Sequence, residues 1–204
     1  GGMSAATRLR RLNEDAEIIV LEKGPFVSFA NCGLPYYVSG DIQERSDLLV
    51  QTPEQLRARF DLDVRPFSEA IAIDPDKKEV TVRSKEGEYQ LAYDKVILSP
   101  GAKPFVPPAE GLSEAKNIFT MRNVPDVDAV TGFILEHKPK KAVVIGAGFI
   151  GLEMAESLAH RGLAVTIVEK APHVLPPFDE EMAAYLADEL EANGVTLYTG
   201  VAAT

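Results

Sequence analysis

Residues 141–151 read KAVVIGAGFIG, and this stretch decides the fold. A short apolar run, 141–145, is followed by glycines at positions 146, 148 and 151 and then by apolar residues at helical spacing. The pattern predicts a strand, a tight glycine turn and a helix, the first half of a βαβ unit. In such a turn the first glycine makes the bend, the second lets the backbone approach a diphosphate, and the third lets the helix pack closely on the strand.

The second strand of this unit, predicted over 163–168, is followed by an acidic residue. Glu169 stands where a carboxylate binds the ribose 2′-hydroxyl of a dinucleotide. Because a carboxylate repels a 2′-phosphate, the sequence predicts NADH as the preferred nucleotide, with some NADPH use. A glycine turn with a purely structural role is the alternative.

The N-terminal residues repeat the later part of this pattern. A helix is predicted over 2–12 and a strand over 16–21, and Glu22 follows that strand. Gly2 fits the last glycine of a second fingerprint, and Glu22 fits its ribose-binding acid, although a solvated acid at a strand end is the simpler alternative. Two nucleotide folds in one chain predict a flavin and a nicotinamide that pass electrons between them.

The rest of the chain supplies further elements. Strands are predicted over 62–65, 69–73, 79–83 and 95–98, and helices over 126–136, 149–161 and 179–193. Residues 103–117, which hold three prolines and a glycine, predict a crossing between domains.

The fold class expected is α/β, with two Rossmann-like nucleotide-binding domains. We expect an FAD-binding domain over 1–103, a linker over 104–117 and an NAD-binding domain over 118–204. We expect both domains to be incomplete and the chain to be part of a larger protein, because no strand precedes the first helix and the chain stops just after a strand.

Composition excludes several classes of protein. The net charge of −10 argues against nucleic-acid binding. No apolar run reaches the length of about 18 residues that a membrane span needs, and no secretion leader opens the chain, so we expect a cytoplasmic protein. The three histidines lie far apart at 137, 160 and 173, so no metal site is predicted.

The only cysteine, Cys32, lies in the segment SFANCGLPYY, residues 28–37. A lone cysteine is either a buried structural thiol or a reactive one. Cys32 precedes a possible short helix, and a helix start favours the thiolate that a nucleophile needs. Since no second cysteine exists, its oxidised form is a sulfenic acid or a mixed disulfide with another molecule.

Several segments together resemble one enzyme family. The cysteine segment, together with EKG at 22–24, QTPE at 51–54, LSPGA at 98–102 and GFIGLEM at 148–154, is similar to coenzyme A disulfide reductases and NADH-dependent persulfide reductases of the pyridine nucleotide–disulfide oxidoreductase family. NADH oxidases and peroxidases of that superfamily usually differ around the cysteine.

The resemblance implies cofactor and substrate sites. The FAD site would be lined by Gly2, Glu22, Lys23, Ser99 and Gly101. The nicotinamide nucleotide would be bound by Gly146, Gly148, Phe149, Ile150, Gly151, Glu153 and Glu169, with Phe149 as an aromatic gate. Coenzyme A would contact Ser28, Asn31 and, on the first helix, Ser4, Arg8 and Arg11, with Arg59 as a weaker candidate; a solvated arginine face is the alternative. The family also implies a homodimer.

The mechanism implied passes electrons from NADH through FAD to Cys32, which reduces coenzyme A disulfide or persulfide. One alternative is an NADH oxidase or peroxidase in which Cys32 cycles through a sulfenic acid. A second is a nucleotide-binding fragment without turnover, and we expect this chain alone to be inactive.

Overall fold

The computed structural model describes residues 1–112 and 114–203, which divide into two compact units. The first unit comprises Gly1–Ala30 and Leu49–Ala102. The second comprises Asn31–Leu48 together with the chain from Lys103 onward. The segment that carries Cys32 therefore packs with the second unit.

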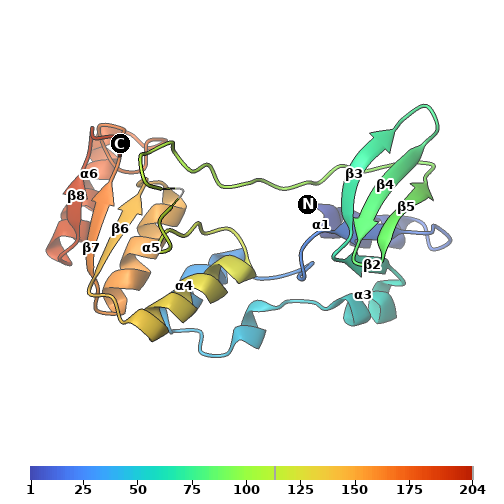
Figure 1. Ribbon diagram of the computed structural model, residues 1–204, viewed down its shortest axis with the longest axis horizontal. Coiled ribbons are helices and arrows are strands. Elements are labelled where there is room, and N and C mark those ends of the chain that lie inside the picture. The colour runs from blue at the N-terminus through green and yellow to red at the C-terminus, as the bar shows by residue number, and fades with distance from the viewer. Residues whose placement is uncertain (113, 204) are drawn as a thin grey trace. The chain divides into compact units, whose positions relative to one another are not determined.

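The first unit holds two helices and two small sheets. Its helices are α1 (Gly2–Leu12) and α3 (Pro53–Phe60), and its strands are β1 (Ile19–Glu22), β2 (Asp63–Pro66), β3 (Glu69–Asp74), β4 (Glu79–Ser84) and β5 (Gly87–Ala92). Strands β1 and β2 are parallel, with Ile19 opposite Asp63, whereas β3, β4 and β5 form an antiparallel sheet (Figure 1). Helix α3 begins with a capping box in which Thr52 and Gln55 bond each other's backbone amides.

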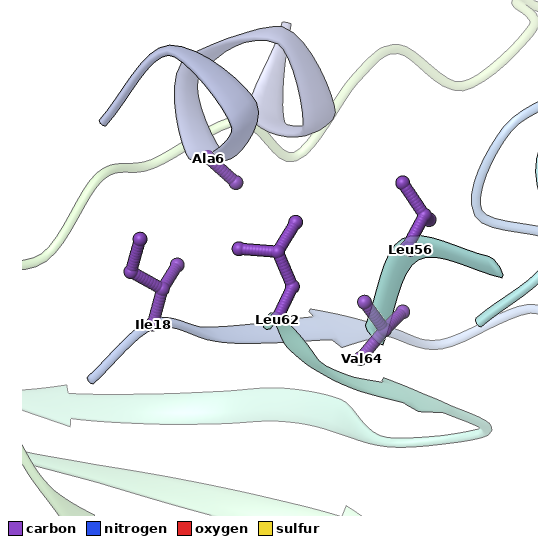
Figure 2. Packing of buried hydrophobic residues seen from close by; sticks show 5 residues of the cluster. All are labelled: Ala6, Ile18, Leu56, Leu62 and Val64. Carbon is purple, nitrogen blue, oxygen red and sulfur yellow. The ribbon is translucent and has the colours of Figure 1, made fainter. Parts of the chain in front are cut away.

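A small apolar core joins α1 and α3 to the parallel strands. Ala6 of α1 and Leu56 of α3 face Ile18, Leu62 and Val64 beside the two strands (Figure 2). Leu62 is fully buried, so this core packs the two helices against the parallel strands, the first of which ends at Glu22.

The second unit contains a three-stranded parallel sheet with β7 (Ala164–Val168) between β6 (Lys141–Ile145) and β8 (Thr196–Tyr198). Helix α5 (Phe149–His160) connects β6 to β7, and α6 (Glu180–Ala192) connects β7 to β8 (Figure 1). Ahead of the sheet come α2 (Leu34–Ser39), α4 (Val124–His137) and two 3₁₀ turns, Asn31–Gly33 and Arg45–Leu48. Helix α2 packs on both α4 and α5.

The α/β prediction is confirmed, and most predicted elements are present with small shifts at their ends. The strand predicted over 95–98 is wrong. Val96, Ile97 and Leu98 are exposed, and no described strand pairs with them, whereas an extended segment becomes a strand only when a neighbour bonds its backbone. Sequence analysis also missed β5, whose residues are largely polar and exposed.

Among the described residues, no helix has the length and apolar character needed to cross a membrane. The described part of the chain also contains no cluster of three or more acidic, histidine or cysteine side chains that could hold a metal ion.

Candidate functional site

The glycine turn between β6 and α5 has the geometry that its three glycines predict. Gly146 has φ +100°, in the left-handed region that favours glycine. A Cβ atom on Gly151 would lie 2.0 Å from the carbonyl oxygen of Gly146, so the third glycine is required by packing. A Cβ on Gly148 would meet nothing within 4 Å, and Gly148 is the N-cap of α5. The turn therefore leaves open space at a helix N-terminus, as a diphosphate requires.

Glu169 closes this turn from the end of β7, and only 9% of its surface is exposed. Its Oε2 accepts a hydrogen bond of 2.6 Å from the amide of Ala147, and its Oε1 accepts one of 2.7 Å from the amide of Ala171. A carboxylate has roughly four lone-pair sites, so two remain for ribose hydroxyls. We call Glu169–Ala171 the second acidic corner.

An aromatic pair lies at the start of α5. Phe149 and Ile150 are both more than half exposed, and Glu153 one turn later is also exposed. The ring of Phe149 contacts Phe178 edge to face, with 6.0 Å between centroids. Sequence analysis missed Phe178, which precedes the N-cap of α6 and shares no motif with the glycine turn.

The first unit contains a similar corner at the end of β1. Glu22 Oε1 accepts a hydrogen bond of 2.6 Å from the amide of Gly24, and we call Glu22–Gly24 the first acidic corner. Nearby, a Cβ on Gly2 would lie 3.3 Å from the Ser99 Cβ, so the helix start and the 98–102 segment meet closely. Gly101 has φ +71°, and the side chain of Lys23 is exposed.

Cys32 is an exposed free thiol in the 3₁₀ turn that leads into α2. Asn31 beside it is exposed, and both belong to the second unit, whereas Ser28 belongs to the first. The buried structural thiol that a lone cysteine often represents is therefore not what the fold contains. An exposed thiol is accessible to a substrate.

The arginines of α1 divide into two groups. Arg10 is tied into the first unit, because it donates to the carbonyl oxygens of Phe60 and Asp61 at 2.9 and 2.8 Å. Arg8, Arg11 and Ser4 are exposed on the same helix, and no ion pair involves them within the described residues. Arg59 in α3 is exposed and lies over the Phe60 ring, 5.1 Å from its centroid.

Comparison with known families decides the identity of the fold. Residues 1–204 match the pyridine nucleotide-disulphide oxidoreductases. The chain belongs to this family.

Members of the family with solved structures or curated names resemble the chain closely. Coenzyme A disulfide reductase of Staphylococcus haemolyticus is 41% identical over 198 residues, which cover 96% of this chain and 44% of that protein. The crystal structure of reduced CoADR-RHD from Bacillus anthracis has a TM-score of 0.96 and 52% identity, covering 98% of this chain and 36% of that one. A NAD-dependent persulfide reductase from A. fulgidus has a TM-score of 0.92 and 37% identity, covering 97% of this chain and 37% of that one. The chain thus spans less than half the length of these family members.

Within the family fold, the structure groups the predicted residues into three sets. The first acidic corner lies with Gly2 and Ser99 in the first unit. The second acidic corner lies with the glycine turn and the Phe149–Phe178 pair in the second unit. Cys32 forms a third set, also in the second unit but at the start of α2.

Proposed function

We propose that this chain binds FAD and NADH and that, within its full-length protein, it reduces coenzyme A disulfide or persulfide through Cys32. The observation that carries this proposal is the exposed thiol in the same compact unit as a glycine turn closed by a carboxylate. Similarity to a coenzyme A disulfide reductase and to a persulfide reductase supports the choice of substrate.

The residues present fit both nucleotides. The second acidic corner keeps free lone pairs beside an open glycine turn, so Glu169 would bind the ribose of NADH, and the α5 N-terminus would bind its diphosphate. Phe149 and Ile150 would border the nicotinamide, and Glu153 would lie near its junction with the flavin. In the first unit, Glu22 would bind the FAD ribose, and Gly2, Lys23, Ser99 and Gly101 would line the rest of that site.

The thiol chemistry belongs to Cys32. Its thiolate attacks one sulfur of coenzyme A disulfide, the S–S bond breaks, and one coenzyme A leaves as a thiolate while the other stays on Cys32 as a mixed disulfide. FAD, when bound, supplies the relay that carries two electrons from NADH to this sulfur. With those electrons and one proton, the second coenzyme A leaves as a thiol and the Cys32 thiolate is restored.

Charged side chains of α1 would hold the substrate. Arg8 and Arg11 are exposed and would donate to the phosphates of coenzyme A, while Ser4, Ser28, Asn31 and Arg59 would supply further contacts. We also propose that flavin binding belongs to residues 1–103 and nicotinamide binding to 118–204, joined by 104–117, of which residue 113 lies outside the described residues. The full-length protein would be a homodimer located in the cytoplasm. Light scattering on the purified protein tests the dimer.

The deciding experiment uses Cys32→Ser in the full-length flavoprotein. We expect the variant to keep FAD and to be bleached rapidly by NADH, since hydride transfer needs no thiol, while disulfide reduction is lost. An undiminished rate of disulfide reduction would show that Cys32 is not the nucleophile.

Assays with different electron acceptors distinguish the proposed activity from its alternatives. NADH-driven oxygen or peroxide consumption without activity on coenzyme A disulfide or persulfide would support an oxidase or peroxidase. Nucleotide binding without any turnover would support a non-catalytic role.

A further inference from the structure

The segment that carries Cys32 is hydrogen-bonded to the C-terminal end of α5. Arg161, the C-cap residue of α5, donates a hydrogen bond from Nε to the carbonyl oxygen of Val38 in the last turn of α2. Its Nη2 also lies 3.6 Å from the position that a Cβ on Gly40 would take. The guanidinium of Arg161 therefore sits against the C-terminal end of α2.

Further contacts hold the same segment to the second unit. Arg45 forms a two-pronged ion pair with Asp128 of α4, with N–O distances of 2.7 to 2.9 Å. His160 Nδ1 lies 3.6 Å from a carboxylate oxygen of Asp41. Beneath these polar contacts, Val38 and Leu48 are fully buried.

Helix α2 needs such contacts to exist. It has six residues, far fewer than the roughly 12–15 that an isolated helix needs for marginal stability. The last carbonyl groups of a helix have no partner within it, and a cation near them is favourable. The amides of Gly40 and Ile42 bond the carbonyl of Tyr36, whereas the carbonyl of Val38 is bonded by Arg161.

We propose that Arg161 is a positioning residue for Cys32, an inference that rests on the proposed function. The N-cap residue of α5 is Gly148 of the glycine turn, and its C-cap residue is Arg161. The N-cap of this helix therefore belongs to the nucleotide turn, and its C-cap residue bonds the thiol segment. Arg161 acts through α2 and touches neither the thiol nor the nucleotide.

The test compares Arg161→Ala and Arg161→Lys in the full-length flavoprotein, with Arg83→Ala as a control. Arg83 is an exposed arginine of the first unit that pairs with Glu88. Three kinds of measurement are made: amide hydrogen exchange at Gly40 and Ile42, steady-state kinetics (kcat and KM) with coenzyme A disulfide, and the rate of flavin reduction by NADH.

For Arg161→Ala we expect exchange at Gly40 and Ile42 to accelerate about tenfold or more. We expect kcat/KM for the disulfide to fall about tenfold or more, because a displaced nucleophile loses its alignment. Flavin reduction by NADH should stay within about twofold of wild type. Arg161→Lys should restore most of the protection from exchange and most of kcat/KM for the disulfide. Arg83→Ala should match wild type in every measurement.

Unchanged exchange in Arg161→Ala, or equal losses in disulfide reduction and flavin reduction, would overturn the positioning role. The exchange measurement does not depend on turnover. A wild-type protein that reduces neither coenzyme A disulfide nor persulfide would therefore overturn the proposed function, while the exchange measurement would still decide whether Arg161 holds α2.

Discussion

The two acidic corners begin with the same local contact and then differ. In each, a glutamate at the end of a parallel strand accepts a hydrogen bond from the amide two residues later, at 2.6 Å for Glu22 and 2.7 Å for Glu169. Glu169 accepts a second bond from Ala147 in its own glycine turn, whereas Glu22 accepts no second amide from the described residues. The repeated sequence pattern thus produces the same short-range hydrogen bond at both corners. The packing around each corner then determines how many backbone amides donate to the glutamate.

The first prediction compares helix α1 with helix α5, and it carries the largest effect that we expect. Helix α1 carries Arg8 and Arg11, whereas α5 begins with Phe149, so only α1 offers arginine side chains for the phosphates of coenzyme A. Arg8→Ala combined with Arg11→Ala should raise KM for coenzyme A disulfide, at about 1.5–3 kcal/mol for each charge-assisted hydrogen bond that the substitutions remove. Steady-state kinetics with NADH as the second substrate measures this. KM for NADH should not change, and Arg57→Ala serves as a control in an exposed arginine of α3; equal effects on both substrates would indicate damaged folding.

The second prediction concerns the corners themselves. Glu169→Ala leaves the amides of Ala147 and Ala171 without their carboxylate, so the free energy of unfolding should fall by about 2–4 kcal/mol. Glu22→Ala removes the partner of one amide and should cost about 1–2 kcal/mol. Urea unfolding of both variants measures the difference, and Glu169→Gln, which keeps one acceptor oxygen, should lie between wild type and Glu169→Ala. Equal costs would mean that the second bond to Glu169 contributes nothing.

A third comparison contrasts the last glycines of the two sites. An added Cβ on Gly151 would meet a backbone oxygen at 2.0 Å, whereas one on Gly2 would meet the Ser99 side chain at 3.3 Å. We expect Gly151→Ala to destabilise the protein by about 1–3 kcal/mol, because the turn and α5 must separate. Gly2→Ala should cost about 0.5 kcal/mol or less. Thermal unfolding checks both, and a Gly2 variant that is the less stable of the two would contradict the packing described.

The smallest effect is on the choice of nicotinamide nucleotide. If Glu169 binds the ribose as proposed, NADH should be preferred over NADPH by at least about tenfold in kcat/KM, or about 1.4 kcal/mol. Lys170 is exposed beside it and could neutralise part of a 2′-phosphate, so some NADPH use should remain. Glu169→Ala should lower the ratio of kcat/KM for NADH to kcat/KM for NADPH. A wild-type protein that favours NADPH would show that Glu169 does not bind the ribose.

Sequence reasoning located most of the fold through local patterns. Helix α1 was predicted at its observed bounds, and so was β6, because apolar spacing and glycine positions mark such elements directly. The strand predicted over 95–98 failed because β structure depends on a partner, and no described strand pairs there. The Phe149–Phe178 pair was also beyond reach, since nothing in the sequence relates residues so far apart.

What the sequence alone determined is the chemistry available: two glutamates after parallel strands, a glycine turn, and one cysteine in a family-like segment. Only the tertiary structure decided how these groups are held. It placed the cysteine segment in the second unit, through Arg161 on Val38 and Arg45 on Asp128, and it made Glu169 the partner of two amides. The physical reason is the separation along the sequence over which each interaction acts. Turn and helix preferences act over a few neighbouring residues, whereas a side chain that bonds a backbone group more than a hundred positions away is specified only by packing.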